Sequence, residues 1–122
     1  MGGSAVIIGL DTIRDYFQTA AAQGVELKRP MLWGYFFVAR DDEAAQAGEQ
    51  LDATLQAKGY AFVESFGGDD DAVWLHFEKA EQLSAEQLAA ICAEMHELGE
   101  THGLEFDGFD MGNVDGSVLR PA

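Results

Sequence analysis

The chain has 122 residues, of which 22 are acidic and 7 basic, so its formal net charge is −15. This balance excludes a protein that binds nucleic acid directly by neutralising phosphates, and it disfavours binding to anionic membrane surfaces. The length and the hydrophobic fraction of 48% are typical of a single globular domain. The lone cysteine, Cys92, allows no internal disulfide, and the opening residues lack a signal-peptide pattern, so we expect a cytoplasmic protein.

The first half of the chain predicts a helix, a strand and a second helix. Residues 1–10 include adjacent glycines, and we expect a flexible N-terminus there. Apolar residues at helical spacing indicate a helix over 11–23, with Asp11 as its N-cap. The run MLWGYFFVA, residues 31–39, is apolar on both faces, which indicates a central strand. An alanine-rich helix then continues to about Lys58.

The second half predicts a hairpin, a long helix and a last strand. Residues 60–66 and 72–80 are rich in strand-forming residues and flank the turn GGDDD, so they indicate a hairpin. Residues 84–103 have a helical apolar stripe that begins with an S-x-x-Q capping box. Alternating apolar residues from Leu104 onward indicate a final strand, followed by a polar tail.

The predicted order is a leading helix followed by β-α-β-β-α-β. This order is typical of a ferredoxin-like α/β sandwich of the α+β class, with a four-stranded antiparallel sheet. We expect one domain over residues 11–112 and a C-terminal tail over 113–122. Both internal helices should cover the same face of the sheet.

The opposite face of the predicted sheet is the clearest candidate for an interaction surface. Trp74 and His76 should point away from the internal helices. One of two sets from the first strand should join them, either Trp33, Tyr35 and Phe37 or Leu32, Phe36 and Val38. A large apolar patch of this kind indicates a cover, which would be the leading helix, a second copy in a homodimer, or a partner.

Several stretches resemble metal or catalytic motifs but fail on spacing. HELGE, residues 96–100, lacks the second histidine of a zinc helix. The segments 107–109 and 113–116 do not continue into a calcium loop. Cys92 has no thiolate-stabilising neighbour in the sequence and should behave as a small apolar residue. We therefore expect no catalytic residue, no cofactor and no bound metal.

The predicted final strand contains the tetrapeptide Phe106-Asp107-Gly108-Phe109 after the helix exit HGLE. We expect both phenylalanines to anchor the strand, Gly108 to permit a bulge or a close approach, and Asp107 to satisfy backbone donors. The stretch resembles the RraB family of bacterial regulators of ribonuclease E, whose members carry Y-D-G-W here. With AKGY at 57–60 and the aromatic first strand, the resemblance covers residues 31–112. It implies a non-enzymatic protein that binds ribonuclease E and restrains its cleavage of RNA.

The leading functional hypothesis is a non-catalytic regulator that masks a basic surface of a nuclease. The residues expected to contact this partner are Asp41, Asp42, Glu43, Asp69, Asp70, Asp71, Trp74 and His76. One alternative is an immunity-type protein that neutralises a cognate toxin. The other is a small metal-dependent enzyme that uses Asp69 to Asp71, or Asp107, Asp110 and Asp115.

Overall fold

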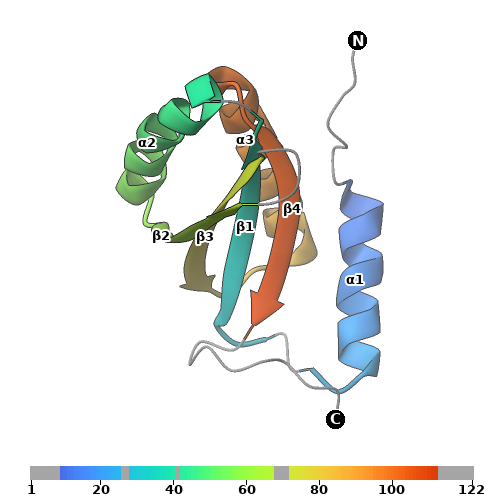
Figure 1. Ribbon diagram of the computed structural model, residues 1–122. Helices are drawn as coiled ribbons and strands as arrows, with labels where there is room; N and C mark the ends of the chain where they lie inside the picture. Colours follow the sequence, from blue (N-terminus) through green and yellow to red (C-terminus); the bar gives the residue numbers. More distant parts are fainter. Residues whose placement is uncertain (1–8, 26–27, 41, 68–71, 113–122) are drawn as a thin grey trace.

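The computed structural model describes residues 9–25, 28–40, 42–67 and 72–112, with the backbone alone for 42–45. Within these ranges, helices and strands follow one another in the order expected from the sequence (Figure 1). They are α1 (Leu10–Ala22), β1 (Met31–Ala39), α2 (Asp42–Ala57), β2 (Ala61–Gly67), β3 (Val73–Glu81), α3 (Ala85–His102) and β4 (Glu105–Gly112). Residues 1–8 of the predicted flexible N-terminus and the predicted tail 113–122 lie outside the described residues.

The four strands form one antiparallel sheet in the order β2-β3-β1-β4. The predicted α+β class and the split βαβ order are therefore confirmed. Strand β1 lies in the interior of the sheet and pairs with β3 on one side and β4 on the other. Its position explains the large apolar residues that face the helices, since both of its edges are paired and that face is covered.

The main core lies between the sheet and a layer of helices on one face. Trp33, Tyr35 and Phe37 of β1 point into this core, and each is at most 1% exposed. Leu51 from α2 and Leu88 from α3 pack against them and are fully buried. Because no polar or charged side chain among the described residues is buried there, burial of apolar surface is the main stabilising contribution.

The leading helix α1 extends the helix layer and leaves the opposite face of the sheet uncovered by any described helix (Figure 1). The ring of Phe17 stacks on Trp33 with centroids 6.0 Å apart. Tyr16 meets Phe109 of β4 edge to face at 5.2 Å. Both contacts use residues on the helix side of the sheet, so α1 is not the cover that the sequence left open as an alternative.

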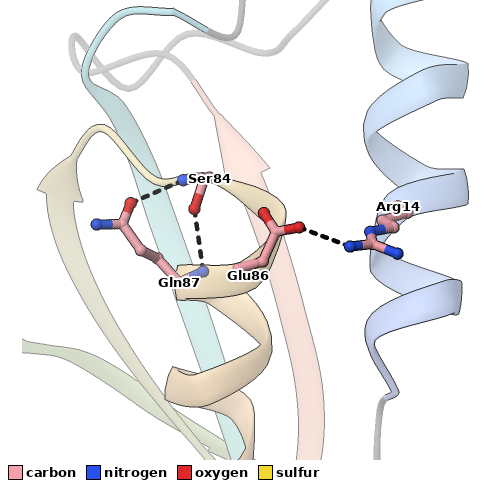
Figure 2. A network of polar contacts seen from close by, with 4 residues as sticks. All are labelled: Arg14, Ser84, Glu86 and Gln87. Atoms are coloured by element: carbon pink, nitrogen blue, oxygen red, sulfur yellow. Dashed lines mark hydrogen bonds and ion pairs between the residues drawn. The ribbon is translucent and has the colours of Figure 1, made fainter.

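The ends of α3 follow the sequence prediction. Ser84 Oγ accepts a hydrogen bond from the Gln87 backbone N–H, and the Gln87 side chain accepts one from the Ser84 N–H (Figure 2). Gly103 ends the helix in the left-handed conformation with φ 73°. Beside the cap, Arg14 of α1 donates to Glu86 at 2.8 Å and ties the two helices together (Figure 2).

The start of α1 differs from the prediction. Asp11 was expected as the N-cap, but the N-cap is Gly9, and its position has no side-chain cap hydrogen bond. The helix begins at Leu10, which is half-buried, so Asp11 lies inside the first turn. A carboxylate in that turn still interacts favourably with the positive end of the helix dipole.

Candidate protein-binding surface

The sheet face opposite the helices, here called the second face, carries aromatic side chains ringed by carboxylates. Alternation along the strands and their pairing define its members. They are Leu32, Gly34, Phe36 and Val38 of β1; Glu64 and Phe66 of β2; Trp74, His76 and Glu78 of β3; and Glu105, Asp107 and Asp110 of β4. The structure therefore selects the second of the two β1 sets that the sequence allowed.

Two aromatic pairs form the centre of the second face. Phe36 and His76 are register partners, and their rings stack at 4.4 Å with an interplanar angle of 12°. Phe66 and Trp74 are partners on the neighbouring strands and stack at 6.0 Å and 11°. Flat aromatic surfaces of this kind bind apolar groups and the planar guanidinium of arginine. Phe66 is 41% exposed, so this surface is accessible.

The FDGF tetrapeptide shapes the second face through a β-bulge. Phe106 pairs with Phe37 and Gly108 pairs with Phe36, so Asp107 is the extra residue. Gly108 has φ 122°, which a residue with a side chain adopts only with strain. The bulge therefore lets Phe106 and Phe109, three positions apart, both pack against the core.

Asp107 of the tetrapeptide has a different partner from the one expected. Its carboxylate was expected to satisfy backbone donors, but Oδ2 accepts a hydrogen bond from Trp74 Nε1 at 3.2 Å. Asp107 follows Phe106, which faces the helices, so alternation places its side chain on the second face. This bond links β4 to β3 across β1 and fixes the orientation of the indole.

A glycine makes room for the polar groups beside the stacked rings. A Cβ at Gly34 would lie 2.7 Å from His76 Nε2 and closer still to the Asp110 carboxylate. Both groups therefore sit directly over the β1 backbone. His76 Nε2 is buried and has no hydrogen-bond partner in the described structure.

The charge of the second face is negative. Glu64, Glu78, Asp107 and Asp110 surround the aromatic pairs. Arg40, which follows β1, is ion-paired with Glu105 at 2.6 Å at the end of the face. A surface of stacked rings with surrounding carboxylates is chemically complementary to arginine and lysine side chains.

The structure describes only two of the sequence-predicted contact residues at side-chain level. Trp74 and His76 lie on the second face, as expected. Asp41 and Asp69 to Asp71 lie outside the described residues. Asp42 and Glu43 begin α2, where the backbone alone is described.

Sequence reasoning missed four contributors to the second face, namely Glu64, Phe66, Glu78 and Asp110, as members of a contact surface. Glu78 lies two residues after His76 in β3, so strand alternation and its negative charge were the available signals. Which residues of β2 lie on the second face could not be found in this way, because the register of β2 against β3 shifts between Phe62 and Glu64.

The possible metal ligands and the single cysteine were the remaining candidates for site chemistry. The described residues contain no group of three or more His, Cys, Asp or Glu that could hold a metal ion. Asp115, the third member of one proposed metal trio, lies outside the described part of the chain. Cys92 is 2% exposed, and burial raises the pKa of its thiol to about 12, so it packs as a small apolar residue.

Comparison with known proteins assigns the family. The family model described as RraB, Regulator of ribonuclease activity B, matches residues 10–111. No curated protein matches the chain. None of the helices within the described ranges is long and apolar enough to cross a lipid bilayer. The chain belongs to the RraB family of non-catalytic regulators of ribonuclease activity, which inhibit ribonuclease E.

Proposed function

We propose that this protein restrains ribonuclease E in the cytoplasm by binding a basic segment of that enzyme on the second face of its sheet. The observation that carries the proposal is the pair of aromatic stacks surrounded by carboxylates on a face that no described helix covers. The family assignment supports a ribonuclease as the target. The single cysteine, which has no disulfide, fits the reducing cytoplasm.

Binding of this kind would inhibit without chemistry. A basic segment of a ribonuclease attracts RNA through its phosphates, because neutralising them releases counterions. The second face offers carboxylates to the same cations and adds stacking surfaces for arginine. Regulator and RNA would then compete for one surface, and cleavage would slow in proportion to its occupancy.

The charge of the whole chain supports a basic partner over a second copy. A net charge of −15 attracts a basic surface at long range and raises the association rate at low salt. Two copies joined through the second face would bring Glu64, Glu78, Asp107 and Asp110 of each into one interface. Like charges so placed would weaken such a homodimer.

A matched pair of charge reversals tests the proposal. Glu78→Lys changes the second face, while Glu97→Lys makes the same change at an exposed position of α3. Affinity for purified ribonuclease E is measured for both variants and the parent at low and moderate salt. We expect Glu78→Lys to weaken binding about tenfold more than Glu97→Lys, with parent binding that weakens as salt rises.

Two outcomes contradict the proposal. Equal weakening by both variants would show that net charge alone, rather than the second face, directs binding. Failure of the parent to bind ribonuclease E at low salt would remove that enzyme as the partner. Recovery of a different basic protein from a lysate would then favour the immunity-type alternative.

A further inference from the structure

The residues of the two edge strands are exposed to different extents. All seven residues of β2 are exposed, and Phe62, Val63 and Phe66 are each 41% exposed. At the other edge, β4 has Phe106 buried and Phe109 in contact with Tyr16 of α1. An exposed edge strand offers unpaired backbone N–H and C=O groups to another extended chain.

Strand β2 carries little of the usual protection against such pairing. Its sequence, AFVESFG, has no proline and no lysine, and Glu64 is its single charge. A register shift between Phe62 and Glu64 disturbs the ladder at Val63. Beyond it, residues 64–67 pair regularly with β3, so this segment keeps the geometry that a further strand needs.

We propose that β2 is where the partner enters: an extended, arginine-containing segment adds to the sheet as a fifth strand beside residues 64–67. The inference rests on the proposed function and names the conformation of the bound segment. Backbone hydrogen bonds to β2 would give affinity, and alternate side chains of the added strand would reach the second face.

Charge complementarity identifies this occupant. A strand beside β2 would extend two rows of side chains that already cross the second face, Glu64–His76–Phe36 and Phe66–Trp74–Val38. An arginine beside Glu64 would pair with its carboxylate, and an arginine or apolar residue beside Phe66 would extend the stack. A second copy of this chain would bring its own Glu64 and a further net charge of −15 to the same edge.

Amide hydrogen exchange of the full chain tests the edge directly. The probe is a short peptide of alternating arginine and valine, and the control is the same peptide with its two central residues replaced by proline, which lacks the backbone N–H that a ladder needs. We expect the first peptide to slow exchange of alternate β2 amides about tenfold or more, with β4 amides unchanged. Unchanged β2 amides, or equal slowing by the proline control, would overturn the inference.

A variant pair connects the edge to ribonuclease E. Val63→Lys places a charge on β2, and Ala90→Lys makes a similar apolar-to-lysine change at an exposed position of α3. Circular dichroism confirms that both fold. We expect Val63→Lys to weaken ribonuclease E binding about tenfold relative to Ala90→Lys. Equal affinities would contradict entry at β2.

The two proposals fail in different ways. If ribonuclease E binds the parent chain but leaves β2 amide exchange unchanged, edge pairing is wrong and the proposed function stands. If ribonuclease E does not bind, the proposed function fails. Exchange measured with the arginine–valine peptide then tests pairing at β2 by itself. Slowed exchange of β2 amides would support such pairing, and unchanged exchange would refute it. Concentration-dependent dimerisation that slows β2 exchange without peptide would assign the edge to a second copy instead.

Discussion

Both faces of β1 carry aromatic residues, but one face forms the core and the other contributes to the second face. Toward the helices, Trp33, Tyr35 and Phe37 are at most 1% exposed and sit among apolar neighbours. On the second face, Phe36 stacks on His76 beside carboxylates from the neighbouring strands. The identity of one strand's residues therefore does not reveal which face is core. The side chains that flank them on adjacent strands do.

The largest expected effect on stability comes from comparing two adjacent residues of β1 that face opposite sides of the sheet. Phe37→Ala should lower the free energy of unfolding by about 3–5 kcal/mol, because a fully buried ring leaves a cavity. Phe36→Ala, which removes a half-buried ring, should cost about 1–2 kcal/mol. Urea denaturation measures both. Equal losses would show that the second face is packed as tightly as the core.

Alkaline pH should lower the stability of the fold through two buried groups on the helix side of the sheet, Cys92 and Tyr60. Burial raises the pKa of Cys92 from 9.0 to about 12. Burial, with the nearby Glu81 charge, raises the pKa of Tyr60 from 10.0 to about 12. Both groups stay protonated in the fold after the unfolded chain has lost its protons, so their contribution is complete below pH 9 and falls as pH rises toward 12. Each group should lower stability by about 1.4 kcal/mol per pH unit where only the unfolded form titrates.

The control for the alkaline effect is Cys92→Ala. This change should lower stability at neutral pH through a small cavity, and it should also flatten the decline just above pH 9. Urea denaturation at a series of pH values gives both quantities. An unchanged slope would mean that the thiol titrates normally in the fold.

The bulge in β4 should be sensitive to a single methyl group. Gly108→Ala places a side chain at φ 122° and should cost about 1–3 kcal/mol. Because Asp107 moves with the bulge, the fluorescence of Trp74 should change as well. Gly67→Ala is the matched control, since a Cβ there meets nothing within 4 Å. Similar thermal stability of the two variants would argue against a strained bulge.

The smallest expected effect on stability separates folding from binding. Trp74→Phe removes the N–H that donates to Asp107 but keeps an aromatic ring on the second face. This exposed bond should contribute about 1 kcal/mol or less. Ribonuclease E affinity should fall more than stability does, because the indole is the larger stacking surface. Urea midpoints measure the change in stability, and binding curves measure the change in affinity. An equal loss of both would contradict a binding role for Trp74.

Much of the fold could be predicted from periodicity. The bounds of β1, Met31–Ala39, match the predicted strand, and Ser84 and Gln87 form the predicted capping box. These features depend on short-range patterns. The choice between the two faces of β1 could not be made in this way, because every position but Gly34 is large or apolar and alternation carries no information.

Features that depend on contacts between distant segments were the ones that sequence could not place. The position of α1 rests on Phe17 meeting Trp33 and Tyr16 meeting Phe109. Asp107 found an indole donor on β3 instead of a backbone donor nearby. Gly108 gave the signal for a bulge, but the partner of the displaced carboxylate required the register of three strands.

The bulge decides which residues of β4 face the helices, and the length of the strand alone does not reveal this. If β4 kept Asp107 but paired with β1 without the bulge, strict alternation would turn over every residue on one side of Asp107. If the pairing of Phe106 held, Phe109 would leave the helix side, and with it the edge-to-face contact that Tyr16 makes. The position of the first helix thus depends on a bulge in the last strand that absorbs one extra residue. A gap at Asp107, by contrast, would remove the bulge and leave Phe106 and Phe109 opposite Phe37 and Tyr35, so the contact with Tyr16 would remain.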